Sequence, residues 1–403
     1  MPSLMKSPYG NVTLLAFCQA LMMSAMSLIT ATSALVGYEL AADKSYATLP
    51  FAAVLIATML TSIPAARLMQ RIGRKPSFMI ASIIAMLGAV GTTLGIIQHD
   101  FWLFFSASIL IGIFNGFGIY YRFTAADTVD DQHKARAISY VMAGGVLAAI
   151  IGPNLANHTQ SLIAQAHFAG SYASLMVVYL LSLCLCVFLK LPGQASFFTE
   201  QATQSARPLK LIIRQPKFIV AVICGMLGYG VMSFVMTATP LAMHQHAYPF
   251  ADTAFVIQWH VLGMFAPSFV TGHLIRRFGL ITIMGVGAVF GILCVAINLS
   301  GTTTSHFFFA LLLLGVSWNF LFIGATTLLT ETYARAERFK TQALNDFIVF
   351  TTVAAASLSA GALQHRFGWQ VVNYAAIPAL AIILMSLLWL KLNNKAGATA
   401  ELG

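Results

Sequence analysis

Runs of about 20 mostly apolar residues recur along this 403-residue chain and restrict its fold more than any other feature. One such run lets a helix cross the hydrocarbon core of a bilayer. The runs are continuously apolar and do not alternate, so they predict helices and not barrel strands. We therefore expect an all-α membrane protein with twelve transmembrane helices. The runs lie at about 12–37, 47–67, 76–98, 101–125, 137–157, 170–190, 217–242, 253–274, 280–299, 305–329, 342–364 and 369–391.

The amino-acid composition excludes a soluble protein of this length. Charged residues make up 8% of the chain and hydrophobic residues 59%, whereas about a quarter of an ordinary globular protein is charged. The five cysteines all lie inside apolar runs, where cysteine acts as a small hydrophobic residue. We expect no disulfide, no metal site and no cofactor.

A basic turn follows the second apolar run, and a degraded copy of it follows the eighth. Arg71-Ile-Gly73 of the turn matches Arg277-Phe-Gly279, 206 residues further on. Asp127 matches Glu331 with an offset of 204 residues. Both offsets are close to half the chain length, so the sequence predicts two related halves.

One long polar loop separates the first six apolar runs from the last six. We expect a six-helix bundle over 1–190, a linker loop over 191–216 and a second six-helix bundle over 217–403. Both halves begin and end on the same side of the membrane. They should therefore be parallel repeats, related by an axis along the membrane normal.

The distribution of the cations predicts the orientation in the membrane. With the N-terminus in the cytoplasm, 19 of the 22 Lys and Arg residues fall on the cytoplasmic side. Only Lys44 and Arg366 lie outside, and Arg122 lies within a helix. This is the positive-inside pattern, so we expect both termini in the cytoplasm of a bacterial inner membrane. The net charge of +10 is then a signal of topology, and no nucleic-acid partner is predicted.

Twelve helices in two halves, a central polar loop and a basic turn after the second helix of each half resemble the major facilitator superfamily. The signature turn of that family reads roughly Gly-x-x-x-Asp-Arg-x-Gly-Arg-Lys, and residues 66–75 here read Ala-Arg-Leu-Met-Gln-Arg-Ile-Gly-Arg-Lys. The Arg-x-Gly-Arg-Lys core is intact, while Gln70 replaces the acid. The resemblance covers nearly the whole chain. It implies a monomeric secondary transporter that moves a small organic solute across the lipid bilayer by alternating access, with coupling to protons as the default.

A second signature of the family, found in helix five of exporters, is half matched. Gly144, Gly152 and Pro153 agree with it, while Ala148 and Ala156 replace further glycines. The match favours efflux of an apolar or amphipathic compound by proton antiport. Uptake of a nutrient or metal chelate and uniport remain the alternatives.

Side chains at the cytoplasmic rim are candidates for a gate that opens as the halves move. We expect Arg71 or Arg74 to pair with Asp127, and the repeat predicts a second pair of Arg277 with Glu331. The alternative is that these residues are exposed topology anchors, worth at most about 1 kcal/mol per pair. The candidate gate residues are Arg71, Gly73, Arg74, Lys75, Asp127, Arg277, Glu331 and Asp346.

Three ionisable side chains near or inside helices have two possible roles each. Asp346 contacts the basic turn or binds a proton, or it is stabilised by the dipole in the first turn of helix eleven. Arg122 binds an anionic substrate or pairs with Asp346, or it reaches out to the interface. His260 takes part in proton coupling, or it is a neutral histidine bonded to a neighbour.

Polar and aromatic residues near the middle of the helices are candidates to line the substrate pathway. Asn115 and Asn319 match at the offset of 204 residues, and an amide in hydrocarbon needs a partner. Trp318 beside Asn319, together with the 30 Phe and 18 Met residues of the chain, favours an apolar or aromatic ligand. The candidate pathway residues are Gln19, Asn115, Tyr120, Arg122, Tyr229, Trp259, His260, Trp318 and Asn319.

The sequence disfavours other classes of membrane protein. A membrane-embedded enzyme needs a clustered catalytic set at one membrane face, and a channel would show rings or filter repeats. Neither pattern occurs, and the phosphate-binding motif Gly-x-x-x-x-Gly-Lys-Ser/Thr is absent from the sequence. We therefore predict a transporter and not an enzyme.

Overall fold

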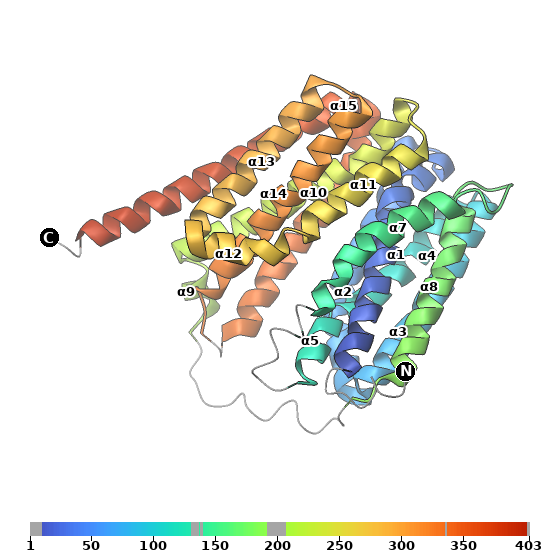
Figure 1. Ribbon diagram of the computed structural model, residues 1–403, viewed down its shortest axis with the longest axis horizontal. Helices are drawn as coiled ribbons and strands as arrows, with labels where there is room; N and C mark the ends of the chain where they lie inside the picture. Colours follow the sequence, from blue (N-terminus) through green and yellow to red (C-terminus); the bar gives the residue numbers. More distant parts are fainter. Residues whose placement is uncertain (1–9, 130–136, 138–139, 192–206, 335–336, 401–403) are drawn as a thin grey trace. The chain divides into compact units, whose positions relative to one another are not determined.

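A computed structural model describes residues 10–129, 137, 140–191, 207–334 and 337–400. Every regular element among these residues is a helix (Figure 1). The first half holds α1 (Gly10–Leu40), the 3₁₀ turn η2 (Lys44–Tyr46), α2 (Leu49–Ile72), α3 (Arg74–Ile97), α4 (Phe101–Gly118), α5 (Tyr121–Ala126), α7 (Gly144–Thr159) and α8 (Ala169–Phe188). The second half holds α9 (Leu209–Ile212), α10 (Pro216–Gln245), α11 (Phe250–Phe265), α12 (Ser268–Phe278), α13 (Leu280–Ser300), α14 (Thr304–Thr330) and α15 (Arg338–Ala400).

The helices agree with the predicted number of membrane spans. Within the described residues, ten helices are long and apolar enough to cross a membrane, and the bent pair α11–α12 makes eleven. The apolar part of α15 is 54 residues long, more than twice the length of about 20 that one span needs. It is broken at Gly368, where φ is 79° and ψ is 179°. Counting its two parts separately gives the twelve spans of an all-α membrane protein.

Three helix junctions turn at a glycine with positive φ. The angle is 92° at Gly73, 87° at Gly279 and 79° at Gly368. Glycine adopts this conformation without the steric cost that a side chain brings. Each of the three glycines follows an arginine by two positions, in Arg71-Ile-Gly, Arg277-Phe-Gly and Arg366-Phe-Gly. The duplicated basic turn is therefore a sharp break between two helices.

Two predicted helices are interrupted in the structure. The helix predicted over 101–125 is α4 followed by α5, with the break after Gly118. The helix predicted over 253–274 is α11 followed by α12, which are bent by 45°. Pro267 lies at this second break, and proline cannot donate the backbone hydrogen bond that a continuous helix requires.

The chain forms two compact units. The first comprises Met1–Phe198 with Met243–Val261, and the second comprises Thr199–Ala242 with Leu262–Gly403. In the first unit α1 packs against α7 and α8, and α3 packs against α4 and α8. In the second unit α13 packs against α14 and α15. The end of α10 and most of α11 thus group with the first unit, where Asn154 of α7 donates to Gln258 Oε1 of α11 at 2.7 Å.

Candidate functional site

The turn between α2 and α3 is tied to the ends of two other helices of the first unit. Arg74 Nη2 donates to Asp127 Oδ2 at 2.6 Å, directly after α5, with side chains that are 22% and 30% exposed. Lys75 Nζ donates to the carbonyl oxygen of Val187 at 2.6 Å, in the last turn of α8. A cation there complements the helix dipole. The predicted pairing of Arg74 with Asp127 is confirmed, while the side chain of Gln70 lies outside the described residues.

The predicted second pair, Arg277 with Glu331, is wrong. Glu331 accepts instead from Lys217 Nζ at the start of α10, at 2.7 Å. The guanidinium carbon of Arg277 lies 5.3 Å from the ring centroid of Phe278.

The reason lies in how the two turns align. Arg74 is the first residue after Gly73, and the residue in the same place after Gly279 is Leu280. Arg277 corresponds to Arg71 and lies before the break. The second half therefore lacks the cation that pairs in the first.

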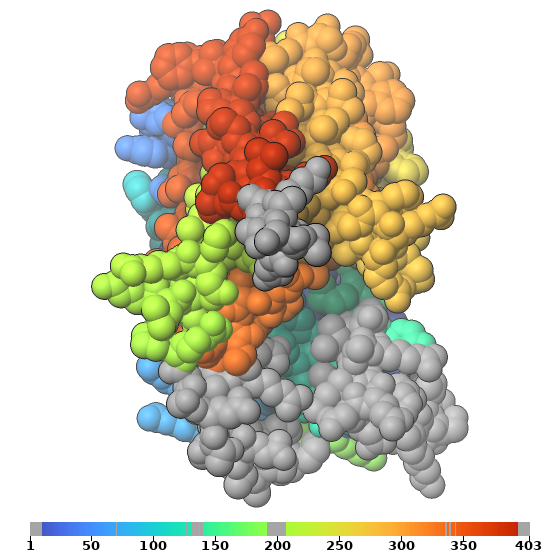
Figure 2. Space-filling view, turned by 90° about the vertical axis from the view of Figure 1, so that its left-hand side faces the viewer, coloured from blue at the N-terminus to red at the C-terminus, as the bar shows by residue number. Residues whose placement is uncertain are grey.

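Glu337, which the sequence did not single out, anchors the end of the linker to the loop between α14 and α15. It is 1% exposed and accepts from the backbone N and Nε of Arg207, both at 2.8 Å, from Arg207 Nη2 at 2.7 Å and from the backbone N of Ala334 at 2.9 Å. Hydrogen bonding to Arg207 lowers the pKa of Glu337 to about 2. In Figure 2 the segment that contains α9, in yellow-green, lies beside an orange part of the second unit.

The repeat between the two halves of the sequence does not mark Glu337. The position 204 residues earlier is His133 and not an acid. A search for features shared by the two halves therefore passes over Glu337. Burial of the carboxylate depends on the fold of the loop, which apolar patterning does not specify.

Five aromatic side chains from four helices of the second unit form a cluster. Trp318 and Phe322 of α14 are stacked, with centroids 4.9 Å apart and an interplanar angle of 11°. Tyr229 of α10 meets both rings edge-on at 5.3 and 5.4 Å, and Phe265 of α11 meets Trp318 at 6.0 Å. Phe350 of α15 lies 6.1 Å from Tyr229. The structure thus brings together two candidate pathway residues, Tyr229 and Trp318.

Asn319, the next residue along α14, binds the break between α11 and α12. Its Nδ2 donates to the carbonyl oxygen of Met264 at 2.6 Å and to Ser268 Oγ at 2.7 Å. Its Oδ1 accepts from Thr271 Oγ1 at 2.7 Å. The side chain is fully buried, and it satisfies a backbone carbonyl that the break leaves without its helical partner. Asn319 is therefore a clamp on the break.

Asn115, which matches Asn319 in the repeat, has different surroundings. Its Nδ2 donates to Met26 Sδ at 2.8 Å, and its Oδ1 is buried without a hydrogen-bond donor among the described residues. Tyr120 OH donates to the carbonyl oxygen of Ser62 at 2.9 Å and so ties the junction of α4 and α5 to α2. Gln19 is buried in α1.

Three further candidates belong to the first unit. The guanidinium of Arg122 lies over the ring of Phe123, 4.8 Å from its centroid. His260 is fully buried in α11. Trp259 is 37% exposed, and its ring meets Phe255 edge-on at 6.2 Å.

Asp346 is not in the first turn of a helix, contrary to the prediction. The helix begins at Arg338, so its first turn holds no acidic residue and Asp346 is its ninth residue. The side chain is exposed, and its Oδ1 accepts from Asn345 Nδ2 at 3.1 Å. The helix dipole acts mainly on the first turn, so it does not account for an acid at this position.

The glycines of the half-matched exporter motif lie where α7 crosses α1. A Cβ on Gly144 would lie 2.9 Å from the backbone N of Ala20, and a Cβ on Gly152 would lie 2.5 Å from the carbonyl oxygen of Ser24. Pro153 lies inside α7. Here the motif lets the two backbones approach closely, as small residues do in membrane helices.

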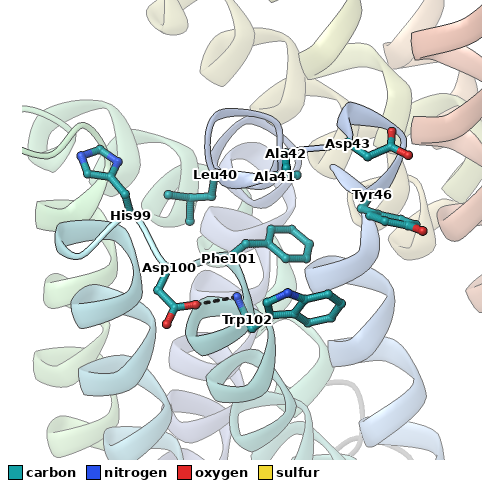
Figure 3. Close-up of a pocket in the computed structure, with 9 residues that line it drawn as sticks. All are labelled: Leu40, Ala41, Ala42, Asp43, Tyr46, His99, Asp100, Phe101 and Trp102. Atoms are coloured by element: carbon teal, nitrogen blue, oxygen red, sulfur yellow. Dashed lines mark hydrogen bonds between the residues drawn. The ribbon is translucent and has the colours of Figure 1, made fainter.

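A pocket of about 450 Å³ lies between the loop after α1 and the loop before α4 (Figure 3). Both of its carboxylates are helix caps. Asp43 Oδ1 accepts from the backbone N of Ser45, and Asp100 Oδ1 accepts from that of Trp102, both at 2.9 Å. The described residues contain no group of three or more His, Cys, Asp and Glu that could hold a metal ion.

Known proteins of similar sequence and structure are transporters. A model of the Major Facilitator Superfamily matches residues 15–347. The riboflavin transporter RfnT of Brucella anthropi is 40% identical over 391 residues, which cover 97% of this chain and 98% of that protein. A D-xylose–proton symporter has a TM-score of 0.74 at 15% identity, over 95% of this chain and 97% of its own. The nucleoside transporter NupG has a TM-score of 0.70 at 16% identity, over 95% of this chain and 99% of its own.

The two solved structures share the fold with this chain, and the sequence relative shares nearly its whole length. The chain is an integral multi-pass membrane transporter of a small solute and not an enzyme. It belongs to the Major Facilitator Superfamily.

Proposed function

We propose that this transporter carries riboflavin or a closely related flavin. The observation that carries the proposal is the 40% identity to a riboflavin transporter, which extends over 97% of the chain. An identity of this extent includes the helices that hold the aromatic cluster.

The aromatic cluster supports a flat ligand. The ring system of riboflavin is planar, fused and aromatic, and stacking of such rings on aromatic side chains is worth about 1–3 kcal/mol per nucleic-acid base. Tyr229, Phe265, Phe322 and Phe350 are half-buried, so they combine an apolar surface with access from outside the core.

For the direction of transport, the half-matched motif on α7 supports proton-coupled export, with uptake or uniport as the alternatives. The glycines of the motif pack α7 against α1, and this packing serves transport in either direction. The motif therefore supports export only through the family resemblance. The described carboxylates lie at helix ends, in loops or, for Asp346, at an exposed helix position, so coupling would use a group such as His260.

The Arg74–Asp127 pair is proposed as part of a gate. It fixes the α2–α3 turn to the end of α5. Breaking the pair would free the turn to move during alternating access, with Lys75 and the Gly73 break guiding the motion. Both ends of the chain are proposed to lie in the cytoplasm, because the basic turns then fall on the inner side.

Riboflavin flux in liposomes that contain the purified protein tests the proposed function. Flavin fluorescence gives the initial rate at equal pH and with a pH gradient of either sign. We expect protein-dependent riboflavin flux that a pH gradient accelerates in one direction. Equal rates under all three conditions would identify a uniporter. The absence of flux with folded protein, at the rate of protein-free liposomes, would overturn the proposal.

A further inference from the structure

The indole N–H of Trp318 is a donor without an acceptor inside the second unit. The side chain is 7% exposed. Its Nε1 is buried, and no acceptor among the described residues lies within hydrogen-bonding distance of it. Buried donors in native proteins almost always have a partner, so each exception needs an explanation.

The indole ring of Trp318 contacts aromatic side chains that are partly exposed. Phe322 is stacked on the indole, while Tyr229 and Phe265 meet it edge-on. These three neighbours are half-buried. A planar ring that enters between them replaces ring contacts within the protein by stacking on the ligand, so little favourable contact is lost.

We propose that the five rings form the subsite for the flavin ring system, and that Trp318 Nε1 donates a hydrogen bond to a nitrogen or carbonyl oxygen at the edge of that ring. This inference rests on the proposed function. The ligand class is a flat, fused heteroaromatic molecule with hydrogen-bond acceptors on its rim. Stacking alone does not distinguish one flat ring from another. The N–H adds selectivity, because it requires an acceptor at one position of the ring.

The clamp beside this subsite fixes its geometry. Asn319 is adjacent to Trp318 and holds the backbone at Met264, the residue before Phe265. Two rings of the subsite, one from α14 and one from α11, are thereby held at a fixed separation. Asn319 is a positioning residue, since it acts on the ligand only through Trp318 and Phe265.

Riboflavin binding to the full chain in detergent, measured by the quenching of riboflavin fluorescence, tests the subsite. Trp318→Phe keeps a ring but removes the N–H, and we expect about tenfold weaker binding, the size of one hydrogen bond. Trp318→Ala also removes the stacking face and should weaken binding about 100-fold. The two substitutions should weaken the binding of lumiflavin, which has the ring system without the sugar-alcohol chain, by the same factors. Trp389→Phe, an exposed position in α15, is the matched control and should bind as the wild type does.

The positioning role of Asn319 has its own readout. We expect Asn319→Ala to weaken binding about fivefold in the wild type and by a smaller factor when Trp318 is already alanine, because only Phe265 then remains for it to position. A purely structural role would lower the melting temperature and leave the affinity of the folded protein unchanged.

Three outcomes separate the inference from the proposed function. Weaker binding of both flavins by folded Trp318→Phe supports the subsite. Wild-type affinity in folded Trp318→Phe and Trp318→Ala would overturn the subsite and leave riboflavin as the substrate. Failure of the wild-type protein to bind or carry riboflavin would overturn both.

Discussion

Asp127 is held by the guanidinium of Arg74 at a place where the break after α2, the end of α5 and the end of α8 meet. The two side chains are only partly exposed, so their attraction is screened less than that of a surface pair. The pair joins a rigid glycine turn to a helix end. Removing one of the two charges would weaken the link between the start of α3 and the end of α5 more than it would change the packing of the core.

The first prediction concerns this pair. We expect Asp127→Asn to lower the initial rate of riboflavin flux about fivefold, because one ion pair of about 1 kcal/mol is lost. The exchange of charges in Arg74→Asp with Asp127→Arg should restore part of the rate. Arg67→Gln, at an exposed cation in α2, is the control and should leave the rate unchanged. Wild-type flux in Asp127→Asn would contradict the gate.

The second prediction concerns Glu337 and pH. Its pKa lies at about 2, below the ordinary value of 4.5, because Arg207 binds the charged form. A lowered carboxyl pKa stabilises the folded state at pH above 4.5, and this contribution is lost as the pH falls toward 2. Glu337→Gln should therefore lower the melting temperature at pH 7 and have no effect near pH 2. A deficit that is the same at every pH would contradict this assignment.

Part of this residue-level arrangement could be predicted and part could not. The Arg74–Asp127 pair could be predicted, since both residues flank helix ends that apolar runs locate. The Arg277–Glu331 pair could not, because Leu280 replaces the pairing cation and Lys217 approaches from another helix. The hydrogen bond of Asn319 to the break between α11 and α12 could not be predicted either, because it depends on the side-chain contacts of α14, which the sequence repeat does not specify.

At the scale of helices, the close crossing of α1 and α7 depends on glycine. The Cβ of any larger residue at Gly152 would lie 2.5 Å from the carbonyl oxygen of Ser24, a backbone atom that cannot move alone. Helix packing in a membrane relies on such small residues, since lipid is as apolar as the helix surface.

The third prediction tests this crossing. Gly152→Ala should destabilise the protein by about 1–3 kcal/mol through overpacking, which thermal unfolding in detergent will show as a lower melting temperature. Gly285→Ala in α13 is the matched control, because nothing lies within 4 Å of the added methyl group. It should gain about 0.5–1 kcal/mol of helix stability. Equal effects of the two substitutions would show that contact with α1 does not matter.

The number and order of the helices could be predicted because long apolar runs are their direct cause. The breaks at Gly118 and Pro267 could not, because a membrane helix can either bend at a glycine or proline or continue through it. The break at Gly368 could be predicted, because it falls between the apolar runs at 342–364 and 369–391. The three Arg-x-Gly junctions do carry a local signal, a glycine that must adopt positive φ.

At the scale of the whole molecule, the two units do not coincide with the two sequence halves. The segment Met243–Val261 belongs to the first unit, although it lies in the second half of the chain. The hydrogen bond from Asn154 of α7 to Gln258 of this segment is a tertiary contact, which the hydropathy of the sequence does not reveal. The separation into bundles at 1–190 and 217–403 remains a prediction about how the protein moves.

Counterflow of riboflavin measures the central claim most directly. Liposomes that contain the protein are loaded with unlabelled riboflavin and diluted into a trace of labelled riboflavin. A carrier with one site exposed alternately predicts a transient accumulation of label above its equilibrium level, unaffected by a large excess of D-xylose. Entry without an overshoot would indicate a channel, and no entry of label above that of protein-free liposomes would contradict riboflavin transport.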